Sequence, residues 1–266
     1  MSTSDRDDMV WKRITVDGER RRYWEHEPLD RAEEGWPALI SLHGAGHNGK
    51  THINKWESAF DRGVTIVCPS STRPYEGHTV YWVVPGHSPA PDSMVDVDFI
   101  EALYKKLKKE GAGKVCLGGF SSGAAFTWWM WLRSGKVNRV AFDGYHMIGV
   151  TCHKDVVNPG PGVVPVFMKM GDAEGGFVPE KRLSFYQSLT KVVKVNGGST
   201  FHYEKKDLGR TCRRKTASSR LYKPPFVGGA PTMAQVVDGG GHWFEFCPYY
   251  QIADQVVRFY KQAGLY

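Results

Sequence analysis

The chain has 266 residues, of which 41% are hydrophobic, and its formal net charge is +7. This length and apolar content suit one domain with one substantial core, so we expect a single domain over 1–266 with a flexible tail at 1–10. No apolar run of about 18 residues occurs, and no nucleic-acid-binding signature accompanies the positive charge. We therefore expect no membrane span and no nucleic-acid partner.

The predicted elements alternate between short strands and helices. The expected strands are at 12–17 and 21–26 (an N-terminal β-hairpin), 38–42, 64–68, 114–119, within 140–149, and at 163–170, 200–204 and 234–237. The expected helices are at 96–110, 124–132 and 249–262. The long stretches 70–92 and 207–231 are expected to be irregular. This alternation predicts an α/β fold: a mostly parallel central sheet with helices on both faces and no large lid domain.

A Gly-x-Ser-x-Gly sequence follows the strand at 114–119. It reads Gly119-Phe120-Ser121-Ser122-Gly123 and leads directly into the expected helix at 124–132. Strand, Gly-x-Ser-x-Gly turn and helix together are typical of the nucleophile elbow of α/β-hydrolases. The flanking glycines remove Cβ atoms that would collide with the strand and the helix. We therefore predict the α/β-hydrolase fold with Ser121 as the nucleophile.

A serine hydroxyl needs a general base, and that base needs an orienting carboxylate. In this fold the order along the chain is nucleophile, acid, histidine. His242 follows a glycine-rich turn after the strand at 234–237, which places it at the expected catalytic edge. Asp172 and Glu174 both follow the strand at 163–170. Counting from Gly171 favours Glu174 as the acid, while Asp172 has the commoner side chain for the role, so both stay open.

An ester hydrolase must also hold the oxyanion of its tetrahedral intermediate with fixed N–H donors. The backbone N–H of Ser122 directly follows the nucleophile, and the second expected donor is the N–H of Ala45 in the turn 43–46. His43 is expected to brace this turn rather than to transfer protons.

Three aromatic residues are placed to line a substrate cleft. Tyr81 and Trp82 lie in the long stretch 70–92, and Trp243 follows the expected catalytic histidine. The expected reaction needs no cofactor. The five cysteines of the chain show no metal-binding spacing.

Several motifs together resemble one group of esterases. They are Leu42-His43-Gly44-Ala45-Gly46, Val95-Asp96-Val97-Asp98-Phe99-Ile100, the elbow, and Gly239-Gly240-Gly241-His242-Trp243. In this order they resemble the polyhydroxybutyrate depolymerase-like and feruloyl-esterase-like α/β-hydrolases. The resemblance implies a secreted or cell-associated serine esterase that acts on polyesters or on aryl and acetyl esters of plant polysaccharides.

The chain departs from that pattern at four places. The acid turn carries an extra glycine, and Trp243 is followed by Phe244-Glu245. The elbow continues as Ser-Ser-Gly-Ala without the common second glycine, and the polar N-terminus lacks the apolar core of an export signal. The sequence thus leaves open an intracellular protein or a trimmed secreted one. We expect a serine carboxylic ester hydrolase acting through an acyl-enzyme. The alternatives are a peptidase or thioesterase on the same fold, and a non-catalytic binding module.

Overall fold

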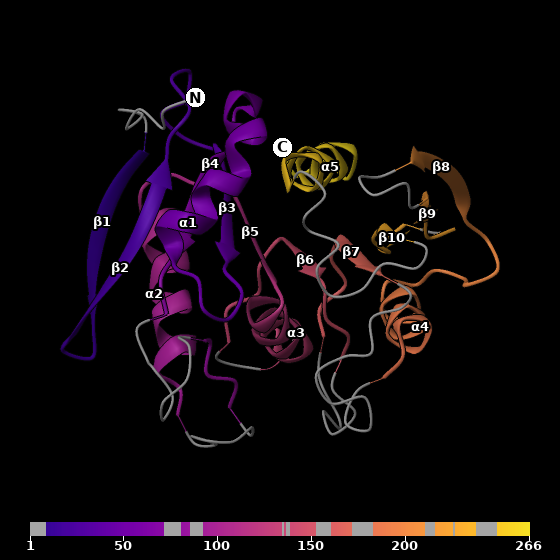
Figure 1. The fold of residues 1–266 in the computed structure, drawn as a ribbon, viewed down its shortest axis with the longest axis horizontal. Coiled ribbons are helices and arrows are strands. Elements are labelled where there is room, and N and C mark those ends of the chain that lie inside the picture. The colour runs from indigo at the N-terminus through magenta and orange to yellow at the C-terminus, as the bar shows by residue number, and fades with distance from the viewer. Residues whose placement is uncertain are drawn as a thin grey trace.

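The computed structural model describes residues 9–71, 81–85, 93–134, 136, 139–152, 161–171, 183–210, 216–225, 227–237 and 249–266. Ten strands form one sheet in the order β1-β2-β4-β3-β5-β6-β7-β10-β9-β8 (Figure 1). The strands are β1 (Met9–Val16), β2 (Glu19–His26), β3 (Pro37–Leu42), β4 (Thr65–Pro69), β5 (Lys114–Phe120), β6 (Gly144–Ile148), β7 (Val166–Gly171), β8 (Glu204–Arg210), β9 (Thr216–Tyr222) and β10 (Thr232–Val237).

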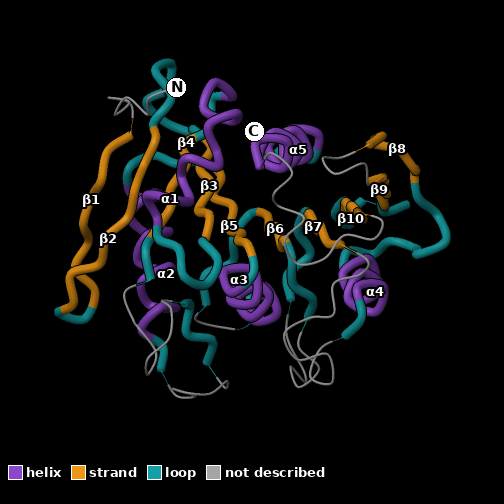
Figure 2. Tube along the Cα trace, viewed as in Figure 1, coloured by secondary structure: helices purple, strands orange, loops and turns teal. Residues whose placement is uncertain are grey.

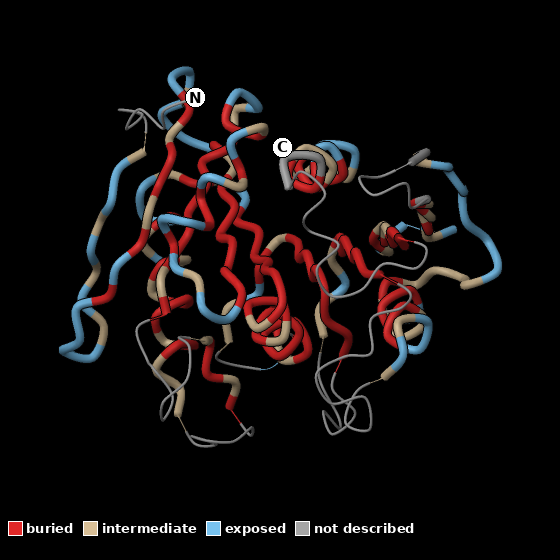
Figure 3. Tube along the Cα trace, in the orientation of Figure 1, coloured by how far each residue is buried: buried red, intermediate tan, exposed pale blue. Residues whose placement is uncertain are grey.

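The middle of the sheet is parallel and its two ends are antiparallel. Strands β4, β3, β5, β6, β7 and β10 run parallel to their neighbours, whereas the hairpin β1–β2 and the pair β8–β9 extend the sheet in antiparallel fashion. The central strands are apolar and buried along nearly their whole length, as parallel strands covered on both faces must be (Figure 3). The predicted parallel sheet and N-terminal hairpin are confirmed, and β1 begins within the expected tail.

Helices cover both faces of the sheet, as predicted (Figure 2). On one face lie α1 (Gly49–Ile53), the 3-10 helix η1 (Asn54–Arg62) and α5 (Tyr249–Gln262), whose apolar side chains share one core. On the other face lie α2 (Val95–Lys109), α3 (Ser122–Arg133) and α4 (Phe185–Val195), which share the second core. Within the described ranges, no helix is both long enough and apolar enough to cross a membrane.

The stretch 207–231 was expected to be irregular, and that expectation is wrong. It contains most of β8 and all of β9, which form an antiparallel pair at the edge of the sheet. The strand expected at 200–204 correspondingly begins only at Glu204. These strands are rich in charged and small polar residues and lack apolar alternation. Their extended form depends on the pairing of β9 with β10 and of β8 with β9 rather than on local pattern.

Candidate active site

Ser121 stands between the end of β5 and the first residue of α3 in a strained backbone conformation. Its φ is 52° and its ψ is −116°, in a region that residues with a Cβ rarely adopt. In the described part of the chain, Asp17 in the first hairpin turn is the one other non-glycine residue with positive φ. The Ser121 N–H donates to the Ile148 carbonyl at 2.9 Å, which ties the turn to the end of β6.

The two glycines of the motif are required by close packing around this turn. A Cβ on Gly119 would lie 2.5 Å from the backbone carbon of Gly123. A Cβ on Gly123 would in turn lie 2.5 Å from the carbonyl oxygen of Leu42. Real Cβ atoms do not approach other atoms so closely, so strand, turn and helix pack in this way only with glycine at both positions.

The turn after β3 lies directly against Ser121. A Cβ on Gly44 would be 3.3 Å from the Cβ of Ser121. The neighbouring Ala45 and the first helical residue Ser122 are the two expected oxyanion donors, and they follow strands β3 and β5, which pair in parallel with Leu42 opposite Gly119. The sheet therefore brings the turn that carries Ala45 to the elbow, as the sequence suggested.

Strands β7 and β10 end at the same edge of the sheet as β5. The last residue of β7, Gly171, is paired with the last residue of β10, Val237. Parallel strands present their carboxyl ends at one edge, where ligands bind in open α/β sheets. A Gly-x-Ser-x-Gly elbow at the end of a buried parallel strand, inside this strand order, decides the fold. The chain adopts the α/β-hydrolase fold.

Comparison with solved structures gives the same fold. An S-formylglutathione hydrolase from Agrobacterium tumefaciens superposes with a TM-score of 0.61 at 12% identity, covering 96% of this chain and 94% of that one. A ferulic acid esterase gives 0.57 at 16% identity, with 94% and 98% covered. An acetyl xylan esterase from Aspergillus awamori gives 0.57 at 12%, with 88% and 94% covered. No family model and no curated protein matches the chain by sequence.

His43 braces the turn after β3, which carries the expected oxyanion donor Ala45. Its Nε2 accepts a hydrogen bond from the N–H of Ser71 at 3.1 Å, so its Nδ1 carries the proton and donates to the Gly44 carbonyl at 2.8 Å. The ring is fully buried, and burial lowers its pKa to about 4. His43 is thus a neutral structural histidine at neutral pH, as expected from its position.

Trp82 lies behind the same turn. The sequence predicted that Trp82 lines a substrate cleft. Its side chain is 1% exposed and packs against Phe126, and its indole N–H donates to the His43 carbonyl at 3.0 Å. Tyr81 is half-buried, and its carbonyl accepts the Ser71 hydroxyl at 2.7 Å. The described contacts of Trp82 and Tyr81 are therefore with His43, Phe126 and Ser71.

A buried ion pair holds this segment, and sequence reasoning missed it. Asp96 accepts the Val83 N–H at 2.8 Å with one carboxylate oxygen and contacts Arg21 of β2 at 2.5 Å with the other. Both charged side chains are at most 2% exposed. Strand alternation could have predicted it, because successive residues of a strand face opposite sides. Arg21 therefore faces inward, whereas Arg20 and Arg22 on either side of it face outward.

Four sequence-predicted site residues fall outside the described residues: Asp172, Glu174, His242 and Trp243. Their roles stay predictions. Over the ranges that the structure describes, no group of three or more His, Cys, Asp or Glu side chains is arranged to hold a metal ion.

Proposed function

We propose that this protein is a serine hydrolase of carboxylic esters that acts through an acyl-enzyme. The single observation that carries the proposal is the strained elbow, in which Ser121 has a φ of 52° at the end of a buried parallel strand. A backbone conformation that costs about 1–3 kcal/mol is typically retained at functional sites, because it aims one side chain at a substrate.

In the proposed reaction the Ser121 hydroxyl oxygen attacks the ester carbonyl carbon. His242 accepts the serine proton as the new bond forms and gives it to the alkoxide oxygen as the bond to the alcohol breaks. Glu174, or Asp172 in its place, orients the imidazole. The N–H groups of Ala45 and Ser122 would hold the oxyanion.

Water then completes the cycle. It attacks the acyl carbon while the imidazole of the histidine takes its proton, and the serine leaves as the ester bond to the enzyme breaks. The acid is released and the hydroxyl is regenerated, so the reaction balances without a cofactor. The three solved structures named above are called hydrolase or esterase, which favours ester-type substrates.

A peptidase is the second candidate on this fold. An acylaminoacyl peptidase from Pyrococcus horikoshii superposes with a TM-score of 0.57 at 10% identity, covering 96% of this chain and 41% of that one. Acyl transfer to water is the same for an ester and an amide, and only the leaving group differs. Rates on matched ester, thioester and amide substrates separate the candidates.

The direct test is labelling by a fluorophosphonate probe together with hydrolysis of p-nitrophenyl acetate. Ser121→Ala should abolish both. Ser218→Ala is the matched control, since Ser218 lies on β9, four strands from β5 in the sheet and therefore about 19 Å away. Retained hydrolysis or labelling in Ser121→Ala would show that another residue is the nucleophile.

A further inference from the structure

One face of the hairpin β1–β2 gathers arginine and tryptophan side chains. In the antiparallel register Trp11 lies opposite Trp24 and Arg13 lies opposite Arg22, and residues directly opposite project to the same face. Arg20 lies two residues before Arg22 in β2, so its side chain projects to the same face. The three arginines are exposed, and Trp11 is 47% exposed.

This face forms one wall of a hollow of about 700 Å³, which we call the basic groove. Lys50 of α1 lies across it, with its ammonium nitrogen 5.3 Å from the centroid of the Trp24 ring. The guanidinium of Arg13 lies 4.4 Å from the Trp11 ring. The groove thus combines four cationic side chains with two indole rings.

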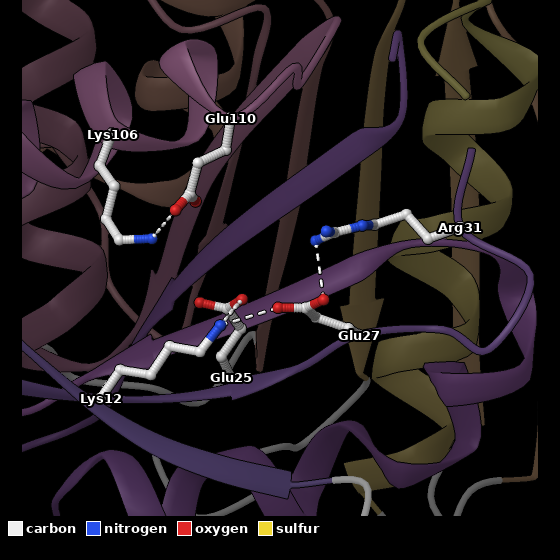
Figure 4. Close-up of polar contacts among 6 residues, drawn as sticks. All are labelled: Lys12, Glu25, Glu27, Arg31, Lys106 and Glu110. Atoms are coloured by element: carbon white, nitrogen blue, oxygen red, sulfur yellow. Dashed lines mark hydrogen bonds and ion pairs between the residues drawn. The ribbon is translucent and has the colours of Figure 1, made fainter. Parts of the chain in front are cut away.

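The carboxylates of the hairpin lie on its other face. Lys12 contacts Glu25 at 2.7 Å and Glu27 at 2.8 Å there, and Glu27 also contacts Arg31 at 3.0 Å (Figure 4). Among the ion pairs that join described residues, none includes an arginine of the basic groove or Lys50. Within the described residues, no carboxylate is paired with the four cationic side chains of the groove, and their charge complements an anion.

The stability of the fold does not explain this grouping of arginines. Like charges directly opposite each other across strands destabilise a sheet, and Arg13 and Arg22 are such a pair. A basic edge strand can prevent edge-to-edge aggregation, but of the two strands of this hairpin only β1 is an edge strand. Arg22 lies inside the sheet, because its residue is paired with β1 on one side and its carbonyl accepts the Ser70 N–H at 2.9 Å on the other. Edge protection therefore does not explain Arg22.

The basic groove reaches the edge of the sheet at which the elbow stands, because Ser70, which lines it, directly follows the carboxyl end of β4. Asn48 also lines the groove, and the Ser70 hydroxyl accepts the Gly49 N–H at 2.9 Å. Asn48 belongs to the segment that follows the oxyanion turn. Ser70 precedes Ser71, whose N–H holds His43. A chain lying in the groove would therefore pass from the hairpin to the edge at which the elbow stands.

We propose that the basic groove binds an acidic polysaccharide, a chain of sugars bearing carboxylates, that presents an ester to Ser121. Guanidinium groups pair with carboxylates through two parallel hydrogen bonds, and indole rings offer flat apolar surfaces to sugar rings. The inference rests on the proposed function. An ester hydrolase needs a polymer that carries carboxylic esters, which sugar hydroxyl and carboxyl groups provide and nucleic acids do not.

The test measures binding of the full chain to polygalacturonate by affinity electrophoresis, with dextran as the neutral polymer and single-stranded DNA as the alternative polyanion. Replacing the three groove arginines together by Gln (R13Q/R20Q/R22Q) should weaken polygalacturonate binding about tenfold or more. The matched control K105Q/K109Q/K136Q removes the same charge from exposed positions and should bind as the parent does. Dextran should not bind.

Two outcomes would overturn the groove assignment: unchanged polygalacturonate affinity in the arginine variant, or tighter binding of DNA than of polygalacturonate. The melting temperature of the variant shows that it folds, and Arg20→Gln alone tests the same groove if the triple variant does not. Binding needs no turnover, so it is separable from catalysis. If the parent is labelled by the fluorophosphonate but the arginine variant binds polygalacturonate with unchanged affinity, only the groove assignment is refuted. If the arginine variant loses affinity but the parent is not labelled, only the esterase proposal is refuted.

Discussion

The strain at Ser121 makes a quantitative prediction about stability. Ser121→Ala keeps the Cβ and therefore the unfavourable φ of 52°, whereas Ser121→Gly removes the steric conflict. Relief of such strain contributes about 1–3 kcal/mol, and the greater freedom of an unfolded glycine costs about 0.5–1 kcal/mol. The glycine variant should therefore be more stable than the alanine variant by about 1 kcal/mol, although both are inactive.

The assay is thermal and urea unfolding of both variants, in which about 1 kcal/mol corresponds to roughly 2–4 °C for a chain of this size. The same pair of substitutions at Ser218 provides the control, because Ser218 lies within strand β9 and is not among the residues with positive φ. There glycine should be less stable than alanine. A glycine variant at 121 that is less stable than alanine would show that the elbow stores no strain.

Three further predictions concern the frame of the site. Gly123→Ala should destabilise the protein by several kcal/mol, since overpacking a close backbone contact is among the costly substitutions. Gly162→Ala is the control, because its Cβ would approach no atom closer than 3.3 Å, and it should change the melting temperature little. Arg21→Met should cost about 3–5 kcal/mol by leaving the Asp96 carboxylate buried without its partner, and the double variant with Asp96→Leu should recover much of that loss in chemical unfolding. Burial and the neighbouring Glu27 carboxylate raise the pKa of Glu25 to about 7, so the folded state binds this proton more tightly than the unfolded state. The contribution of Glu25 to the unfolding free energy is then fully present below about pH 4.5 and is lost as the pH rises through about 7. Glu25→Gln removes this dependence, and parallel unfolding curves for the two proteins between those pH values would contradict it.

The strand and helix pattern in the middle of the chain could be predicted because each element carries its own signal. Strands β3, β5 and β7 are mostly apolar runs of six or seven residues, and β3 and β5 end in glycine-containing turns. The elbow is readable because Gly-x-Ser-x-Gly between a strand and a helix is a short continuous pattern, although the close contact that requires Gly123 comes from Leu42, outside the segment. The outer hairpin of β8 and β9 gave no such signal, since its extended form depends on pairing with β10 from outside the segment.

The roles of individual side chains at the site were less readable. Trp82 lies in the long stretch before α2, but whether its indole faces a cleft or a backbone carbonyl depends on where residues 81–85 lie relative to the turn after β3. The structure places its N–H against the carbonyl of His43. The run Arg20-Arg21-Arg22 likewise looks uniform, yet Arg21 is buried with Asp96 while its two neighbours face the basic groove.

The sequence by itself determined the Gly-x-Ser-x-Gly turn, the strand that leads to it and the fold that such a turn favours, because one short segment carries that whole pattern. The tertiary structure alone decided that the turn after β3 lies against Ser121, that Arg21 reaches Asp96, and that two tryptophans and three arginines share one face with Lys50. Those placements join residues from separate strands and helices. The physical reason is that strand order and register, which no local pattern encodes, fix which distant side chains meet.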